Sequence, residues 1–318
     1  NPMAKRIKLI GSAIGNCGRL NGCESAPYQI SNSLANSEGI LIDADVVAYT
    51  GGSHDVLAQR EFFTKVAHRA ERAITKNVFP IFIGGDHSCA IGSWSGVAYN
   101  LQKQDQELGL IWIDAHMDSH RPNTSETGNL HGMPISHLLG YGHKELTSIL
   151  NALPKLKPEN LVFFGIRSFE KPEEEFLQSL GVKIYYQEML TDENFESLFL
   201  EEYNRLAVQT NGNVGISLDL DGLDPKDIVA VGTPVDNGID SKIFLETMNK
   251  IDINNLIGFE IGEYNPSLDK DHRSMQYMLE LLKSLMIIKE SIDLHSCGIS
   301  QYILNEYLED EEKYEKHL

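Results

Sequence analysis

The stretch LGLIWIDAHMD, residues 108–118, joins an apolar run to three polar side chains spaced two residues apart. The run at 108–113 has no polar residue. Because successive side chains of a strand point to opposite faces of a sheet, it predicts a strand buried on both faces. In the extended backbone that follows, Asp114, His116 and Asp118 lie on a single face. Strands of this kind occur in parallel α/β sheets, where ligands bind beyond the carboxyl ends of the strands. The stretch therefore predicts such a sheet and a polar site at its edge.

Similar apolar runs predict about eight strands along the chain, at 7–14, 46–49, 78–83, 108–113, 161–166, 182–186, 214–218 and 256–261. Segments with helical periodicity lie between or after them, at 54–75, 90–102, 173–180, 194–207, 242–248 and 272–289. Strands that alternate with helices indicate a mostly parallel sheet covered on both faces. No repeat and no Gly-, Pro- or Ser-rich linker divides the chain, so we expect a single α/β domain over residues 3–318.

The composition narrows the function classes. Of the 318 residues, 27 are Lys or Arg and 46 are Asp or Glu, which gives a net charge of −19. This charge disfavours nucleic acid and anionic membranes as partners and favours a cationic ligand. The sequence has neither an apolar run long enough to span a membrane nor the apolar region of a signal peptide, and we expect a cytoplasmic protein.

Three further features are interpreted as peripheral to function. Asn1 and Pro2 precede a methionine and are interpreted as remnants of expression. The four cysteines are too scattered for a disulfide framework and are expected to be reduced thiols, at 17, 23, 89 and 297. The acidic segment 306–318 is interpreted as a solvated tail.

Acids and histidines follow four of the predicted strands. They lie in GGDHS at 84–88, DAHMD at 114–118, SLDLDGLDP at 217–225 and EYNPS at 263–267. Six of these side chains have the chemistry of metal ligands: His87, Asp114, His116, Asp118, Asp219 and Asp221. Four carboxylates brought together cannot all stay ionised without compensating cations.

Two divalent metals would balance these four negative charges. Because six residues cannot fill two octahedral shells, some carboxylates would bridge the ions and a solvent-derived hydroxide would lie between them. Oxygen-rich ligation with two imidazoles and no thiolate favours manganese or magnesium over a structural zinc site. Taken singly, each motif has another interpretation: DAHMD as an acidic strand end, GGDHS as a turn that caps a helix, and DLDGLDP as a turn-rich or calcium-binding loop.

Taken together, the motifs resemble those of the ureohydrolases, and GNLHG at 128–132 is similar to the arginase form. The segment at 19–24 and GTPV at 232–235 add to a resemblance that is close to full length. It implies a three-layer α/β/α fold around an eight-stranded sheet, two manganese ions, and hydrolysis of L-arginine to L-ornithine and urea. It also implies two ligand sets that share Asp114 and Asp219: His87, Asp114, Asp118 and Asp219 for one ion, and Asp114, His116, Asp219 and Asp221 for the other.

The resemblance further implies roles in catalysis. Asp118 would relay a proton to the leaving amine, and His131 would exchange protons with solvent, which needs a group that titrates near neutrality. Glu263 would bind the guanidinium by charge-assisted hydrogen bonds. Family members are commonly trimers or hexamers, which implies a homo-oligomer.

Recognition of the amino-acid end of the substrate departs from the family pattern. His120 stands where arginases have an Asn that binds the substrate carboxylate, whereas Thr127 and Asn129 keep the polar groups of the neighbouring loop. Glu170 replaces the expected Asp near the α-amino group, and Glu173 matches a second family acid.

Several alternatives remain open at this stage. An agmatinase, a guanidino-acid hydrolase or a formimidoylglutamase would use the same chemistry, although agmatinases lack the GNLHG loop. A non-catalytic relative would be expected to have lost ligands, and none is missing. A single-metal deacylase would not need both His87 and His116.

Overall fold

The computed structural model describes residues 6–37 and 42–296, with side chains as far as residue 286. Asn1, Pro2, Cys297 and the acidic segment 306–318 lie outside the described residues. Within the described part, no helix combines the length and the apolar character needed to cross a bilayer.

Eight strands form one sheet in the order β2-β1-β3-β8-β7-β4-β5-β6. Their bounds are β1 Ile7–Ala13, β2 Asp43–Ala48, β3 Phe79–Ile83, β4 Gly109–Ile113, β5 Leu161–Ile166, β6 Lys183–Tyr186, β7 Val214–Asp219 and β8 Leu256–Gly262. Every pair of neighbouring strands is parallel. The eight predicted strands are thus confirmed to within a few residues, and the sheet is wholly rather than mostly parallel.

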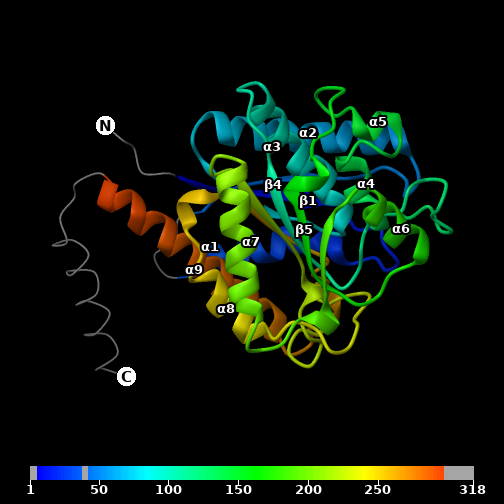
Figure 1. Cartoon of the computed structure of the whole chain (residues 1–318). Helices are drawn as coiled ribbons and strands as arrows, with labels where there is room; N and C mark the ends of the chain where they lie inside the picture. The colour runs from blue at the N-terminus through cyan, green and yellow to red at the C-terminus, as the bar shows by residue number, and fades with distance from the viewer. Residues whose placement is uncertain (1–5, 38–41, 297–318) are drawn as a thin grey trace.

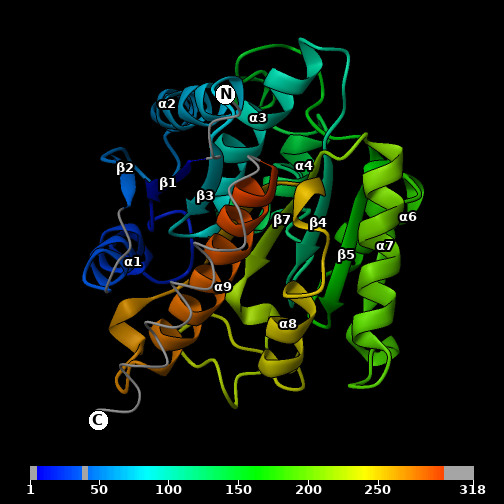
Figure 2. The ribbon, with the colours of Figure 1, turned by 90° about the vertical axis from the view of Figure 1, so that its left-hand side faces the viewer.

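Helices cover both faces of this sheet (Figures 1 and 2), with α2 and α3 on one side and α1, α8 and α9 on the other. Their bounds are α1 Ala26–Ala35, α2 Val56–Thr75, α3 Ala90–Gln102, α4 Pro134–Leu138, α5 Lys144–Thr147, α6 Lys171–Ser179, α7 Phe195–Gln209, α8 Ser241–Met248 and α9 Arg273–Ser296. The three-layer α/β/α arrangement expected from the sequence is confirmed.

The two helix layers enclose separate apolar cores, and β4 shows how the sequence divides between them. Leu110 and Trp112 pack into the core beneath α2 and α3, whereas Ile111 and Ile113 pack into the core beneath α1, α7, α8 and α9. Successive side chains of a strand point to opposite faces, so an all-apolar strand supplies both cores at once.

Helix α1 is the one long element that the sequence analysis missed. Its sequence, APYQISNSLA, contains three Ser or Asn residues, which have low intrinsic helix propensity. The helix is stabilised instead by burial of Ala26, Ile30 and Leu34 against the sheet. Spacings of four residues between these side chains were its only sequence signal.

The order of the strands brings the polar strand ends together. The chain passes from β3 to β4 across the positions that β8 and β7 later fill, so β3, β8, β7 and β4 are direct neighbours. Their carboxyl ends meet at one edge of the sheet, at a switch in strand order of the kind where α/β proteins bind ligands. The loops that begin at residues 84, 114, 219 and 263 therefore converge there.

Candidate metal centre

The first group of candidate ligands surrounds His87, which lies just after β3 and is fully buried. Its Nδ1 atom is 3.5 Å from Asp114 Oδ2, 3.3 Å from Asp118 Oδ2 and 3.3 Å from Asp219 Oδ2. Neither His87 Nδ1 nor Asp118 Oδ2 has a hydrogen-bond partner among the residues that the structure describes. Buried polar atoms without partners are rare, so this set of one nitrogen and three carboxylates fits a cation. The ligand atoms of the four residues lie within 4.8 Å of one another.

The second group shares Asp114 with the first. His116 Nδ1 is 3.3 Å from Asp114 Oδ1 and 3.2 Å from Asp221 Oδ2. These three residues also meet within 4.8 Å. The structure therefore brings all six predicted ligands into two adjoining groups joined through Asp114. Asp219 belongs to the first group only, and its predicted role as a second bridge stays a prediction.

The backbone orients several of these carboxylates. Asp114 Oδ1 accepts from His116 N at 2.7 Å, Asp219 Oδ1 accepts from Asp221 N at 2.9 Å, and Asp221 Oδ1 accepts from Ala115 N at 3.2 Å. In each case one carboxylate oxygen is fixed by a peptide group. The other oxygen, Oδ2, faces a histidine Nδ1 in all three residues, and in Asp114 both oxygens do so.

Two residues of the site adopt left-handed backbone conformations. The φ angles are +46° at Asp118 and +67° at Glu263. Such angles are uncommon for residues with a side chain and are found mostly where function requires them. At both positions the conformation turns a strand end so that its carboxylate faces the cluster.

The electrostatics confirm that the acids cannot all be charged without cations. Burial, followed by the neighbouring Asp114 carboxylate, raises the pKa of Asp118 and of Asp219 well above the usual range for aspartate. Burial of Asp114 is outweighed by His116 and His87, which hold its pKa below the usual value. The cluster therefore keeps one ionised carboxylate and disfavours charge on its neighbours, so four charged carboxylates here would require a cation.

Glu263 and His131 lie beside the first group. Glu263 Oε1 accepts from His87 N at 2.8 Å and is 3.0 Å from His131 Nδ1. Burial disfavours the charged form of His131, but the Glu263 carboxylate outweighs it and raises the pKa of His131 to about 9. Glu263 is buried, which excludes its interpretation as a surface acid.

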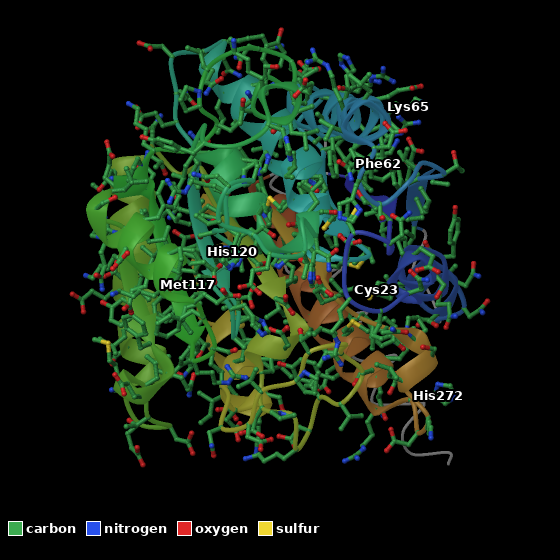
Figure 3. All side chains as sticks on the ribbon, turned by 90° about the vertical axis from the view of Figure 1, so that its right-hand side faces the viewer. Cys23, Phe62, Lys65, Met117, His120 and His272 are labelled. Carbon is green, nitrogen blue, oxygen red and sulfur yellow. The ribbon has the colours of Figure 1, made fainter. Side chains whose placement is uncertain are left out.

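A cavity of about 280 Å³ opens above the cluster. Every predicted site residue except the deeply buried His87 and Asp114 lines it, namely His116, Asp118, His120, Thr127, Asn129, His131, Glu170, Glu173, Asp219, Asp221 and Glu263. In Figure 3 the labelled His120 lies near the middle of the view, while Lys65 and His272 lie towards the rim. The structure thus brings these predicted site residues together around one cavity, and their roles stay predictions.

His120 has partners that the sequence analysis did not foresee. Its Nε2 is 3.3 Å from Glu170 Oε1 and 3.4 Å from Glu173 Oε1, and its Nδ1 is 3.1 Å from Thr124 Oγ1. Both ring nitrogens are therefore engaged within the protein. The neighbouring Arg121 stacks its guanidinium 4.5 Å from the centre of the Phe176 ring and is not among the residues that line the cavity.

Glu170 and Glu173 occupy the beginning of α6. Together they form a capping box, in which Glu173 Oε1 accepts from Glu170 N at 3.1 Å. Glu173 Oε2 also accepts from Ser119 N at 3.0 Å, which ties α6 to the loop of Asp118. Glu173 thus has a structural role in addition to the one predicted for it, whereas Glu170 is largely exposed at the cavity mouth.

The loop of Thr127 and Asn129 is held by short-range contacts. Thr127 Oγ1 accepts from Asn129 N at 3.1 Å, and Thr127 O is 3.1 Å from His54 Nε2. His131 N donates to Cys17 O at 3.1 Å. The segment after β1 and the one before α2 therefore support the loop that carries His131.

The sequence analysis assigned no role to three residues whose hydrogen bonds hold the site in place. Asp86 accepts from Cys17 N at 3.0 Å and from Ser88 N at 3.1 Å, so the interpretation of GGDHS as a helix cap holds for Asp86 beside the ligand His87. Thr233 Oγ1 donates to Asp221 Oδ2 at 3.2 Å. The guanidinium of Arg167 donates to carbonyls of the loop after β7, including Asp221 O at 2.7 Å. Arg167 follows directly on β5, but a search for acids and histidines at strand ends passes over it.

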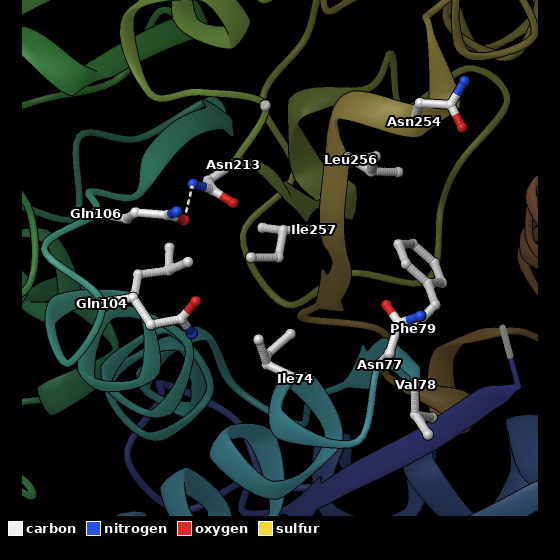
Figure 4. Close-up of a pocket in the computed structure, with 12 residues that line it drawn as sticks. Ile74, Asn77, Val78, Phe79, Gln104, Gln106, Asn213, Asn254, Leu256 and Ile257 are labelled. Carbon is white, nitrogen blue, oxygen red and sulfur yellow. Dashed lines mark hydrogen bonds between the residues drawn. The ribbon is translucent and has the colours of Figure 1, made fainter. Parts of the chain in front are cut away.

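A second depression lies at the opposite, amino-terminal edge of the sheet (Figure 4). Amide side chains such as Gln106 and Asn213, which hydrogen-bond to each other at 3.0 Å, line it together with apolar residues such as Ile257. Its lining contains no charged residue and no predicted ligand. The candidate ligands therefore all lie at the carboxyl edge.

Comparison with known proteins points to one family. The arginase family profile matches residues 5–288 of the chain. Arginase of Bacillus caldovelox is 39% identical over 224 residues, which are 70% of this chain and 73% of that protein. Arginase of Bacillus subtilis strain 168 is 37% identical over 236 residues, 73% of this chain and 76% of that protein. The crystal structure of arginase from Bacillus subtilis superposes with a TM-score of 0.79 at 32% identity, covering 88% of this chain and 98% of that one.

Proposed function

The chain belongs to the arginase family, and we propose that it hydrolyses L-arginine to L-ornithine and urea with two manganese ions held at the carboxyl edge of the sheet. One observation carries this proposal above the others. Two adjoining groups of histidine and aspartate ligands lie at the bottom of a cavity, and the buried Glu263 carboxylate lies beside them.

The residues present fit the metal that the family implies. His87 Nδ1 and Asp118 Oδ2 are buried without partners, and the donor set is rich in carboxylates, which suits Mn²⁺. His87, Asp114, Asp118 and Asp219 would hold one ion, and Asp114, His116, Asp219 and Asp221 would hold the other. When bound, the two ions supply a hydroxide nucleophile at neutral pH by lowering the pKa of water.

Glu263 would bind and orient the guanidinium. Its Oε1 already accepts from His87 N, which leaves Oε2 to receive an N–H of the substrate. His131 holds the pKa of Glu263 below its usual value against the effect of burial, so the carboxylate is ionised at neutral pH. A charge-assisted hydrogen bond of this kind fixes the guanidinium carbon above the cluster.

Asp118 and His131 would handle the protons. After attack on the guanidinium carbon, the C–N bond to ornithine breaks only if the departing amine nitrogen receives a proton. Asp118 Oδ2 faces the cluster without a hydrogen-bond donor among the described residues; it would accept the proton that the nucleophile gives up and pass it to the departing nitrogen. His131 lines the outer cavity and contacts Glu263, so it can exchange protons between the site and solvent.

The mouth of the cavity would receive the amino-acid end of the substrate. Glu170 is exposed there, with Oε1 beside His120, and would attract the α-ammonium. Thr127, Asn129 and His120 would face the α-carboxylate. Because Nε2 of His120 already contacts Glu170 and Glu173, the substrate carboxylate would have to share or replace one of these contacts.

A substrate panel tests the proposal. The manganese-loaded protein is assayed for urea release from L-arginine, agmatine and guanidino acids, and for formamide release from formimidoylglutamate. The proposal requires the highest kcat/KM for L-arginine. A higher value for another substrate would overturn the assignment to arginine while leaving the hydrolytic chemistry intact.

We also propose that the protein is a cytoplasmic homo-oligomer, a trimer or a hexamer. Cys17, Cys23 and Cys89 are buried free thiols, which accords with a reducing compartment. Light scattering of the manganese-loaded protein measures its mass in solution, and a monomer would contradict the oligomeric part.

A further inference from the structure

We propose that Trp94, Glu260 and Ser217 form a hydrogen-bond chain that fixes the ring proton of His87 on Nε2 and thereby directs Nδ1 to the metal. This inference rests on the proposed metal site. It assigns positioning roles to three buried residues that lie beneath the ligands and do not line the cavity.

The chain is continuous in the structure. Trp94 Nε1 lies 2.9 Å from Glu260 Oε1, Ser217 Oγ lies 2.8 Å from the same oxygen, and His87 Nε2 lies 2.8 Å from Ser217 Oγ. All four residues of the chain, counting His87, are fully buried. Solvent therefore has no access to any hydrogen bond of the chain.

The direction of every hydrogen bond in the chain follows from the one between Trp94 and Glu260. An indole N–H can only donate, so Glu260 Oε1 must accept from Trp94. An oxygen that accepts in this way is poorly placed to carry a proton itself, so the Ser217 hydroxyl donates to it. Since that hydroxyl has a single proton, Ser217 Oγ can only accept from His87. In the neutral imidazole that binds a metal, the proton is then on Nε2, and the lone pair is on Nδ1, which faces Asp114, Asp118 and Asp219.

Sheet register explains how the chain forms. Trp112 on β4 pairs with Ser217 on β7, Ser217 pairs with Glu260 on β8, and Glu260 pairs with Phe82 on β3. This row therefore lies on the face covered by α3, because Phe82 and Trp112 belong to the core on that side. Trp94 reaches the row from α3 and His87 from the loop after β3.

Trp112 completes the orientation of the imidazole. Its ring stacks on His87 with centroids 3.9 Å apart and planes 12° apart, and its Nε1 donates to Asp114 Oδ2 at 2.9 Å. The stack fixes the plane of the imidazole, and the hydrogen bond from Nε2 fixes its rotation within that plane. Both restraints aim the same atom, Nδ1, at the carboxylates.

A purely structural role explains the chain less well. A serine and a carboxylate facing each other in the centre of an apolar sheet are costly to bury, and apolar residues of similar size would pack there without that penalty. Partners that hold metal-binding histidines in this way typically affect metal affinity by 10- to 100-fold. The presence of a glutamate at position 260, inside an apolar strand, is thus explained by its effect on His87.

Metal affinity of matched variants tests the inference. Ser217→Ala removes the acceptor for Nε2–H, while Glu260→Gln keeps an oxygen for Trp94 and Ser217 and removes only the charge. Thr247→Val is the control, because Thr247 is a buried residue on α8 whose hydroxyl, within the described part of the chain, donates to Ile243 O of its own helix at 2.8 Å and to nothing in the site. Manganese binding is titrated by calorimetry, and thermal unfolding of the metal-free proteins reports structural damage.

We expect Ser217→Ala to weaken manganese binding at the site that contains His87, one of the two in the titration, by about 10- to 100-fold. Glu260→Gln should lie between Ser217→Ala and the wild type, and Thr247→Val should bind as the wild type does. Equal affinity of Ser217→Ala and the wild type would refute the inference alone. Failure of the wild type to bind manganese would refute the proposed metal site as well.

The tautomer itself is a second readout. In protein labelled with ¹⁵N-histidine and loaded with diamagnetic Cd²⁺, we expect the proton of His87 on Nε2, protected from exchange, and the cadmium coupling on Nδ1. In Ser217→Ala that proton should exchange faster. A proton on Nδ1, or cadmium bound through Nε2, would overturn the inference.

Discussion

Removing the metal should reverse the pH dependence of stability. In the metal-free protein, burial raises the pKa values of three ligand carboxyls above their usual range, those of Asp118, Asp219 and Asp221. Burial likewise raises the pKa of the nearby Asp86 to about 6. A carboxyl whose pKa is higher in the folded than in the unfolded state stabilises the fold at low pH, and this contribution is lost as pH rises through the folded pKa.

The pH range over which stability is lost follows from these pKa shifts. Unfolded aspartates titrate near pH 4, so the contribution of Asp86 is lost between about pH 4 and 6, and that of the ligand acids continues to fall at higher pH. His87 and His116 have raised pKa values because neighbouring carboxylates outweigh burial, and they act in the same direction. Asp114, with its lowered pKa, contributes fully above about pH 4 and therefore adds no slope between pH 5 and 8. The metal-free protein should therefore become less stable from pH 5 to pH 8.

The metal-loaded protein should show the opposite slope. Manganese requires deprotonated ligands, so acid displaces it and removes its contribution. At a free metal concentration 100 times Kd, each site adds about 2.7 kcal/mol, and two sites add about 5 kcal/mol. For a chain of this length that corresponds to a rise in Tm of roughly 10 °C at neutral pH.

The assay is thermal unfolding between pH 5 and 8 of chelator-treated and manganese-loaded protein at one ionic strength. Asp219→Asn should raise the Tm of the metal-free protein at pH 8, because it removes a disfavoured charge, and should reduce the gain from manganese. Asp236→Asn, a change at an exposed carboxylate, is the control and should do neither. Parallel pH profiles with and without metal would refute the reasoning.

Four further predictions concern single residues. Asp118→Asn should weaken manganese binding and abolish turnover, whereas His131→Asn should spare metal content and lower kcat by about 10²- to 10⁴-fold, as metal analysis and urea release would show. Glu263→Gln should raise KM for every guanidino substrate by roughly tenfold or more, because a hydrogen bond between charged groups is lost; an unchanged KM would exclude Glu263 from guanidinium binding. His120→Ala should raise KM for L-arginine and leave agmatine, which has no carboxylate, nearly unchanged. Manganese should quench the intrinsic fluorescence, and Trp112→Phe, which removes the indole stacked on His87, should reduce the quenching.

Much of the fold was predictable because of how parallel sheets are built. Strands such as β4 are buried on both faces, so each appears in the sequence as an unbroken apolar run, and the polar residue after it marks its carboxyl end. For the same reason the six candidate ligands could be named before the structure was known. Helix α1 could not be predicted as easily, because its stability comes from packing against the sheet rather than from its own sequence.

The supporting residues were harder to find because their roles depend on strand order. Ser217 and Glu260 lie 43 positions apart in the chain and meet only because β7 and β8 are neighbours. Each is a single polar residue within an apolar strand, and that exception is the signal which could have identified it. The contact of His120 with Glu170 depends on how α6 docks against the loop after β4, which no local pattern encodes.

Manganese content measured against turnover tests the central claim most directly. Protein stripped of metal is reloaded stepwise, freed of unbound manganese by gel filtration, and assayed for metal per chain and for urea release from L-arginine. The account predicts that activity rises until two manganese ions are bound per chain. Full activity with one ion per chain or fewer would contradict it.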